Sequence, residues 1–317
     1  MSAVFVSWIA HHGRSAAIAV EVGAEQHFLT GGNGPAPLRY ARAALETRRL
    51  LRRNIDRPAS ALVMLPPTPA LLSAVLSRRD LPVAGDLHSG VFNDPKWSWA
   101  LNLTLRILKR RGVAIVTNES LARRCRQHGV ETIVLHDMIE NFDGPLPEAP
   151  LGLEAQRYVL FPVTYAPDEP IDAILAAAAA SPDVAFVLTG RAPEQLKSSA
   201  PSNVVFPGFV SQAEFLALLR NAGAVAALTT REDTMQRAGY EALSAGVPLI
   251  ASSTRVLREY FEDTAVYTDA TADGLHTAVT EAFRERARRV EQVSQLKARR
   301  QIEQAAALEK LRDWMAR

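Results

Sequence analysis

The sequence predicts an α/β protein built from two similar halves, and both its length and its pattern of short apolar runs support this. At 317 residues the chain is about twice the size of a usual domain. In each half, short β-branched runs alternate with segments of helical periodicity, which is typical of parallel α/β layers. Residues 144–156 are rich in proline and glycine and are expected to form a linker. We therefore expect domains over 1–143 and 157–317.

The predicted strands are short apolar runs, six in each half. In chain order they are Val4–Ile9, Gln26–Leu29, Ala61–Leu65, Val83–His88, Ala114–Thr117 and Thr132–Leu135, then Tyr158–Val163, Val184–Thr189, Val204–Phe206, Ala224–Leu228, Pro248–Ala251 and Val266–Thr268. Helices are expected between the strands, and in the second half they lie near Pro170–Ala180, Gln212–Asn221, Met235–Ala245 and Arg255–Tyr260. A long charged helix from Ala272 to near Trp314 is expected to return to the first domain.

The composition excludes several classes of protein. Hydrophobic residues make up 48% of the chain and charged residues 22%, which is ordinary for a soluble globular protein. The longest apolar runs are too short to span a bilayer, and the N-terminal segment lacks the basic region of a signal peptide. Cys125 is the only cysteine, which excludes internal disulfides and a thiolate metal site. The sequence therefore predicts a cytoplasmic protein.

The charge is unevenly divided between the halves. Residues 1–150 hold 18 Lys and Arg against 13 Asp and Glu, whereas residues 151–317 hold 18 against 21. In the predicted helix Arg39–Arg53, residues at helical spacing, which include Ala43, Thr47 and Leu50, are expected to face the sheet. Arg42, Arg49 and Arg53 lie on the other side of this helix. A basic first half suits an anionic partner such as a diphosphate, an acidic sugar or the inner face of a membrane. The basic segments carry no nucleic-acid motif and no interleaved aromatics, so we expect no nucleic-acid partner.

Candidate site residues are expected where the strands end, because ligands of parallel α/β sheets bind outside the carboxyl ends of the strands. The richest such stretch is 229–248. It predicts a polar turn, a helix from near Thr234 to Ala245 capped by Asp233 or Thr234, and a stop at Gly246. Asp233 and Glu241 are eight residues apart, which places one carboxylate at the helix entrance and the other two turns further in.

The stretch from Asp233 to Ile250 resembles the donor-site signature of GT-B glycosyltransferases of the GT4-like type, E-x7-E followed by A-x-A/S-x-G-x-P-(V/L)-I. Here Glu241-Ala-Leu-Ser-Ala-Gly-Val-Pro-Leu-Ile matches the second part, and Asp233 replaces the first Glu. Val184–Gly190 with Arg191, and the run Val204–Ser211, resemble two further elements of the family's second domain. The first half resembles the family more weakly, through its strand pattern and through Asp86-Leu-His88.

The resemblance implies two Rossmann-like domains facing across an interdomain cleft, with a nucleoside-diphosphate sugar as the donor. The sugar nucleotide, a UDP- or GDP-sugar, would be a substrate, and no cofactor or metal site is expected. In the second domain the implied donor contacts are Glu241 with the ribose, Asp233 with the transferred sugar, Thr234 and Met235 with the distal phosphate through their backbone N–H groups, Arg191 with the diphosphate and Phe209 with the base.

In the first domain the resemblance implies a glycine-containing loop near the diphosphate, to which Gly13 and Arg14 belong. Asp86 and His88 are two residues apart at a strand end, so their side chains share one face. An Asp in this position orients the imidazole, and His88 is then a candidate catalytic residue that contacts the sugar or the acceptor.

One stretch departs from the family pattern. Family members carry an Arg and a Lys after the first strand of the second domain, whereas Phe161–Pro170 has no basic residue. Arg191, Arg237 and Arg14 are the candidates to replace them.

The resemblance implies a hexosyltransferase-like enzyme (EC 2.4), retaining and metal-independent, with an unknown acceptor. Two alternatives are a sugar-nucleotide 2-epimerase or hydrolase on the same fold, and a weakly active GT-B-like subunit that binds a nucleotide sugar or a partner enzyme.

Overall fold

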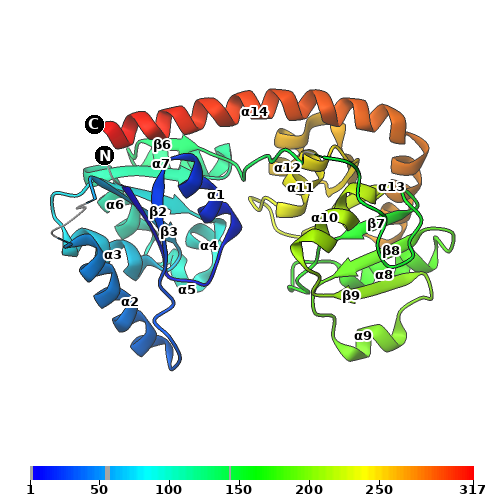
Figure 1. Cartoon of the computed structure of the whole chain (residues 1–317), viewed down its shortest axis with the longest axis horizontal. Helices are drawn as coiled ribbons and strands as arrows, with labels where there is room; N and C mark the ends of the chain where they lie inside the picture. Colours follow the sequence, from blue (N-terminus) through cyan, green and yellow to red (C-terminus); the bar gives the residue numbers. More distant parts are fainter. Residues whose placement is uncertain (1–2, 54–57, 143) are drawn as a thin grey trace. The chain divides into compact units, whose positions relative to one another are not determined.

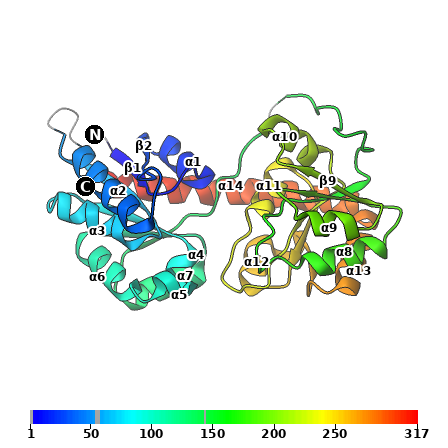
Figure 2. The same ribbon diagram turned by 90° about the horizontal axis from the view of Figure 1, so that it is seen from below.

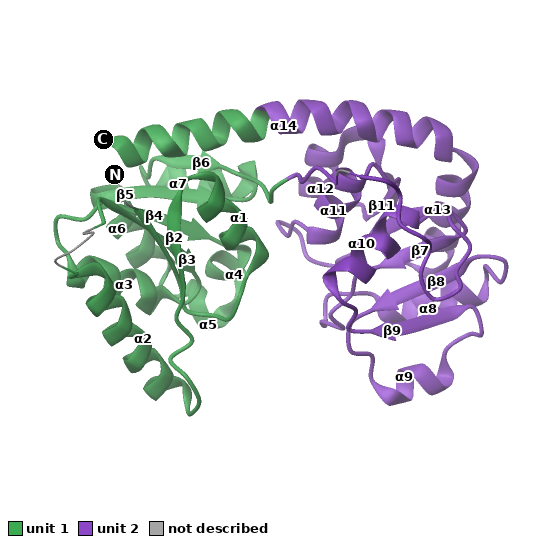
Figure 3. Cartoon of the chain, viewed as in Figure 1, with its two compact units in different colours: residues 1–138, 303–317 green, residues 139–302 purple. Residues whose placement is uncertain are grey.

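The computed structural model describes residues 3–53, 58–142 and 144–317, and the chain folds into two compact units (Figure 3). Unit 1 comprises residues up to 138 together with 303–317, and unit 2 comprises residues 139–302. The segment expected to be a linker is held on unit 2: Arg220 donates to the carbonyls of Gly144 and Pro145, and the Asn221 side chain donates to Pro147 at 2.9 Å. This segment is therefore part of unit 2 rather than a separate connection.

Unit 1 contains a six-stranded parallel sheet in the order β2-β1-β3-β4-β5-β6 (Figure 1). Its strands are β1 (Ala3–Ser7), β2 (Ala24–Phe28), β3 (Ser60–Leu65), β4 (Val83–Leu87), β5 (Gly112–Val116) and β6 (Thr132–Val134). Its helices are α1 (Gly13–Glu21), α2 (Ala36–Leu51), α3 (Thr68–Ser77), α4 (Ser89–Asn93), α5 (Pro95–Ser98), α6 (Leu101–Arg111) and α7 (Glu119–Gln127). The strand order reverses between β1 and β3, so the first and third strands lie side by side.

Unit 2 contains a second six-stranded parallel sheet, in the order β12-β11-β10-β7-β8-β9. Its strands are β7 (Tyr158–Phe161), β8 (Ala185–Thr189), β9 (Val204–Gly208), β10 (Ala224–Ala227), β11 (Leu249–Ser252) and β12 (Val266–Thr268). Its helices, labelled in Figure 2, are α8 (Ile171–Ala179), α9 (Glu194–Ser199), α10 (Gln212–Asn221), α11 (Arg237–Ala245), α12 (Arg255–Phe261) and α13 (Ala272–Arg284), and the short 3-10 turn η1 (Glu262–Thr264) follows α12. Here the order reverses between β7 and β10.

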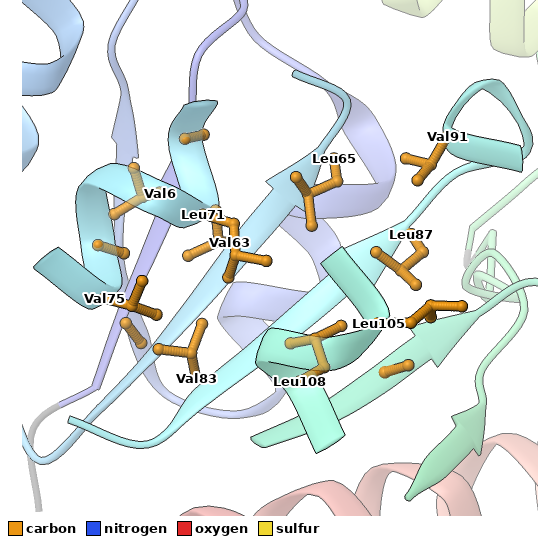
Figure 4. Close-up of a cluster of buried hydrophobic side chains, with 14 of the residues drawn as sticks. Val6, Val63, Leu65, Leu71, Val75, Val83, Leu87, Val91, Leu105 and Leu108 are labelled. Carbon is orange, nitrogen blue, oxygen red and sulfur yellow. The ribbon is translucent and has the colours of Figure 1, made fainter. Parts of the chain in front are cut away.

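Helices cover both faces of each sheet, which explains why the strands read as continuous apolar runs. All six residues of β3 are buried, as expected of a parallel strand covered on both sides. On one face of unit 1, β3 and β4 pack against α3 and α6 through the side chains labelled in Figure 4, which include Val63, Leu65, Leu71, Val83, Leu87, Leu105 and Leu108. On the other face, α1 packs with the last part of the terminal helix α14 (Arg286–Ala316).

The sequence predictions of the strands and of most helices are confirmed. All twelve predicted strands are present, with ends that differ from the prediction by at most two residues. In α2, Ala43, Thr47 and Leu50 are buried as predicted, and the Thr47 hydroxyl accepts a hydrogen bond from the indole of Trp8 at 2.9 Å. The long C-terminal helix is two helices, because α13 ends before Glu285 and α14 begins at Arg286. Trp314 is buried among residues of unit 1.

Within the part of the chain that the structure describes, none of the helices is both long enough and apolar enough to cross a membrane.

Candidate active site

The carboxyl edge of the unit 2 sheet carries a cavity of about 430 Å³. It lies where the strand order reverses between β7 and β10, which is where open α/β sheets bind their ligands. The loops after β7, β8 and β9 line it together with the residues that lead into α11. The lining residues are Pro162, Val163, Thr164, Ala166, Asp168, Glu169, Thr189, Gly190, Gly208, Phe209, Val210, Phe215, Thr234, Gln236, Arg237, Ala238 and Glu241.

A close approach of two loops shapes one wall of this cavity. Gly190 has a φ of +86°, and a Cβ placed there would lie 2.2 Å from the carbonyl oxygen of Val163. Only glycine allows this backbone geometry at this distance. The Gly190 N–H donates to the carbonyl of Gly208 at 3.0 Å, so the ends of β8 and β9 are tied together beside the cavity.

The turn before α11 differs from the prediction. The helix begins at Arg237 rather than near Thr234, and its N-cap, Gln236, makes no side-chain cap bond. Asp233 has a φ of +58°, a left-handed conformation that Asp tolerates better than most residues but that no helix can contain. Its carboxylate accepts from the Arg255 guanidinium at 3.2 Å instead of capping the helix. The predicted stop is confirmed, because Gly246 ends α11 in the left-handed conformation.

Glu241 lies on α11 and lines the cavity with its carboxylate already paired. The Arg237 Nε donates to Glu241 Oε1 at 2.9 Å, across one turn of the helix. Both side chains line the cavity, and the Glu241 side chain is 19% exposed. This carboxylate is therefore held in place and still reachable by a ligand.

Two further predicted residues lie at the cavity and two lie beside it. Phe209 lines it with 78% of its surface exposed, and the Arg191 guanidinium lies 5.4 Å from the centre of the Phe209 ring. Thr234 also lines it, whereas Met235 packs its side chain against the apolar core of unit 2. The role predicted for Met235 uses its backbone N–H and does not depend on that side chain.

Sequence reasoning did not single out Glu169, although this residue orders the loop after β7. Its carboxylate accepts from the backbone N–H groups of Thr164 and Ala166 at 2.8–3.1 Å and from the Thr164 hydroxyl. Between them, Tyr165 has a φ of +60°, and its buried hydroxyl has no partner among the described residues. The loop that carries basic residues in the family thus holds an internal carboxylate on its own N–H groups.

The unit 1 residues gather around a buried ion pair at the ends of β1 and β4. The Arg14 guanidinium contacts Asp86 Oδ1 at 3.1 Å and Asp137 Oδ1 at 3.3 Å. The Arg14 side chain is 1% exposed and the Asp86 side chain is fully buried. Burial opposes ionisation of Asp86, but Arg14 and His88 hold the pKa of this carboxyl well below its usual range. Arg14, a predicted diphosphate contact, already has two carboxylate partners.

His88 and His12 lie together beside this pair. His88 Nε2 is 3.2 Å from Asp86 Oδ2, so the predicted Asp–His pair is present, and the His88 Nδ1 has no hydrogen-bond partner among the described residues. The two imidazole rings meet edge to face, with centroids 4.9 Å apart. His12 is the N-cap of α1, which begins at Gly13, and its Nδ1 accepts from the Ser15 N–H.

The position of His12 predicts a stability that falls in mild acid. Burial and then the neighbouring His88 lower the pKa of His12 to about 4. An unfolded His takes up its proton near pH 6.5, so the unfolded state binds the proton first and stability is lost between about pH 6.5 and 4. His12→Asn keeps a good cap and removes the titration. We expect the difference in melting temperature between pH 7 and pH 5 to be smaller in this variant, and an unchanged difference would contradict the assignment.

Among the described residues, no group of three or more His, Cys, Asp or Glu side chains is arranged to hold a metal ion. The thiol of Cys125 is buried, and burial raises its pKa to about 12.

Comparison with known proteins finds one family model that matches a segment of the second half. Residues 164–290 match the family model of glycosyl transferases group 1. Among curated protein sequences, none matches the chain. The family match covers every residue that lines the cavity except Pro162 and Val163, and it includes the whole of the turn and helix from Asp233 to Ala245.

Solved structures share the architecture of the whole chain. The sucrose-phosphate synthase from Thermosynechococcus elongatus has a TM-score of 0.78 at 14% identity, with 98% of this chain and 97% of that chain covered. Anabaena HepE, in complex with UDP and glucose, has a TM-score of 0.73 at 15% identity, with 100% and 99% covered. A glycosyltransferase from Rickettsia africae has a TM-score of 0.71 at 9% identity, with 99% and 97% covered. The shared architecture of two parallel six-stranded sheets is the GT-B fold, and the match of residues 164–290 to glycosyl transferases group 1 marks the chain as a transferase.

Proposed function

We propose that the chain transfers a sugar from a nucleoside-diphosphate sugar to an acceptor, with the donor bound in the cavity of unit 2. The observation that carries this proposal is the set of groups around that cavity: Glu241, the N-terminus of α11 and the exposed ring of Phe209. A volume of about 430 Å³ lies within the range of about 300–1,000 Å³ typical of small-molecule sites. HepE has been solved with UDP and with UDP-glucose, which favours a UDP-sugar over a GDP-sugar as the first donor to test.

The nucleoside would be recognised by Glu241 and Phe209. An ionised carboxylate only accepts hydrogen bonds, which suits the two neighbouring hydroxyl donors of a ribose. Arg237 holds the Glu241 carboxylate in position at 2.9 Å. Phe209 and Arg191 offer an apolar face and a cation beside it for the base and the first phosphate.

The diphosphate would lie against the start of α11. Unpaired N–H groups and the partial positive charge of a helix N-terminus bind phosphate well, and Thr234 and Met235 directly precede this terminus. Arg237 and Arg191 would supply the positive charge that the loop after β7 lacks. Because Glu169 already occupies the N–H groups of that loop, we expect the diphosphate to depend on α11 rather than on the β7 loop.

The transferred sugar would face Asp233, whose carboxylate stabilises the positive charge that develops on the ring as the leaving group departs. The left-handed backbone at Asp233 supports this role, since strained residues gather at functional sites. His88 would contact a hydroxyl of the sugar or of the acceptor through Nδ1, because Nε2 faces Asp86. Retention of configuration and independence of metal ions belong to this proposal by analogy with the family.

A thermal-shift screen of UDP-, GDP- and dTDP-sugars on the whole chain tests the proposal. A donor at about 100 times its dissociation constant adds about 2.7 kcal/mol of stability. We expect this stabilisation from the sugar nucleotides of one base and little from those of the other two. Glu241→Gln should lose most of the shift, whereas Glu194→Gln, at a carboxylate of unit 2 that pairs with Lys197 in its own helix and does not line the cavity, should keep it. No shift with any sugar nucleotide would contradict the proposal.

Analysis of products separates transfer from the other reactions of this fold. Incubation with the donor alone should leave it intact, and turnover should require an added acceptor. An epimerised sugar nucleotide, or free sugar released at the full rate without acceptor, would instead identify a 2-epimerase or a hydrolase.

A further inference from the structure

A cationic surface with exposed apolar side chains covers one side of unit 1. Helix α6 carries Arg106, Lys109, Arg110 and Arg111 and no acidic residue. Its inner face is apolar, because Leu105 and Leu108 are fully buried against the sheet. Arg106, Lys109 and Arg110 are exposed and form no ion pair with any described acidic residue. This charge is therefore not compensated within the part of unit 1 that the structure describes.

The N-terminal end of the same helix face is apolar rather than charged. Trp99 is 76% exposed and Leu103 is 41% exposed. Leu103, Arg106 and Arg110 share one side of α6, and Trp99 lies in the turn that precedes this helix. The Trp99 indole N–H donates to the carbonyl of Lys96 at 2.9 Å, which fixes the ring in its exposed position. A large aromatic side chain held in solvent beside cations needs a partner with both apolar and anionic parts.

The basic end of α6 borders a hollow of about 480 Å³. It is lined by Asn102, Arg106, Lys109, Arg110 and His128, with no acidic residue. Lys109 reaches the end of α7, where its Nζ would lie 2.9 Å from a Cβ built at Gly129. Three cations and an amide around one hollow form a suitable site for a phosphate group.

Helix α2 also combines exposed cations with exposed apolar side chains. Its outward face exposes Arg39, Arg42 and Arg49 beside Leu38 and Leu45, which are 44% and 55% exposed. Helices α2, α3 and α6 belong to one layer, since they pack against the same face of the sheet and Arg111 of α6 donates to the carbonyl of Val75 of α3. Cations and single apolar side chains thus recur across this layer.

We propose that this layer of unit 1 docks on an anionic lipid membrane, with Trp99 and Leu103 in the headgroup region and a lipid phosphate in the hollow beside α6. Amphipathic surfaces of this composition bind at the interface of a bilayer through apolar insertion and attraction to anionic lipids. Exposed leucines gain nothing from a nucleic acid or another soluble polyanion, whereas tryptophan favours the membrane interface. The docking is independent of the donor site in unit 2.

Co-sedimentation of the whole chain with vesicles tests this proposal. We expect binding to vesicles containing phosphatidylglycerol, none to pure phosphatidylcholine, and loss of binding as salt rises. Each basic residue near an anionic surface raises the affinity for the membrane about fivefold. The double variant Arg106→Gln with Arg110→Gln should therefore bind the vesicles about 30-fold more weakly. The control with the same net charge is Arg284→Gln with Arg288→Gln, two exposed positions of unit 2, and it should bind like the wild type. Equal weakening of both pairs would overturn the proposal.

Fluorescence quenching by brominated phosphatidylglycerol reports contact between tryptophan and the lipid, which electrostatic attraction alone does not produce. We expect quenching in the wild type and its loss in Trp99→Phe, although that variant still sediments with vesicles. Trp8 and Trp314 are buried and should not respond, and Trp97, which is partly buried and lies two residues from Trp99, is replaced by phenylalanine in both of the proteins compared. Quenching that persists in Trp99→Phe, or binding to transfer RNA as tight as to vesicles, would overturn the proposal in favour of another orientation or a soluble polyanion.

Discussion

Replacing Arg14 by methionine is expected to destabilise unit 1 by about 3–5 kcal/mol, the usual cost of removing one partner from a buried ion pair. Arg14 and Asp86 are almost completely removed from solvent, and Asp137 adds a second carboxylate on the same guanidinium. Without the guanidinium, Asp86 would remain as a buried carboxyl with only His88 as a partner. Thermal unfolding followed by circular dichroism measures the change, and we expect the melting temperature to fall by roughly 6–20 °C.

The double variant Arg14→Met with Asp86→Leu is the control. It removes both charges, so it should recover much of the lost stability, because the cost lies in the uncompensated charge rather than in the missing contact. Its His88 would no longer be oriented, and activity should stay low. A single Arg14→Met variant that melts like the wild type would show that the pair does not hold this part of unit 1.

Substitutions of Glu241 and of Asp233 are expected to change different kinetic constants. Glu241, held by Arg237 at the cavity, should bind the ribose equally in the ground and transition states, so Glu241→Gln should raise the donor KM with a smaller effect on kcat. Asp233 should face charge that develops only during the reaction. Asp233→Asn is therefore expected to lower kcat by about 100-fold. Steady-state kinetics with the donor from the thermal-shift screen measures both.

Glu232→Gln is the matched control for Asp233→Asn. Glu232 is the neighbouring carboxylate and also contacts Arg255, because its carboxylate accepts a hydrogen bond from the Arg255 backbone N–H at 3.2 Å. A variant at Glu232 should keep its kcat if Asp233 acts on the sugar. If Asp233→Asn keeps full kcat while Asp233→Ala only melts at a lower temperature, the carboxylate is a structural partner of Arg255 and the catalytic assignment is wrong.

The strands and the buried helix faces could be predicted from sequence because each depends on residues that are near one another in the chain. The six residues of β3 form one apolar run, and the inner face of α2 follows the helical spacing of Ala43, Thr47 and Leu50. The stop of α11 at Gly246 was equally readable, because one glycine sets the left-handed end.

Two of the features that were missed depend on partners far away in the chain, and a third depends on backbone N–H groups. Helix α11 begins later than the sequence predicts, and the carboxylate of Asp233 binds Arg255, 22 residues away, instead of capping the helix. Arg14 meets Asp86 and Asp137 across 72 and 123 residues, so nothing in its local sequence showed that its charge is already paired. Glu169 is only five residues from Thr164, but a carboxylate on backbone N–H groups leaves no pattern of side chains to read.

Hydrogen exchange of the whole chain, with and without saturating nucleotide, tests the central claim most directly. If the donor binds in the cavity of unit 2, nucleotide should slow exchange in peptides covering 162–169, 189–191, 208–215 and 234–241, which line it or adjoin it. Exchange in the helices of unit 1 that carry the cationic layer should stay the same. Protection confined to unit 1, with no change around Glu241, would contradict the account.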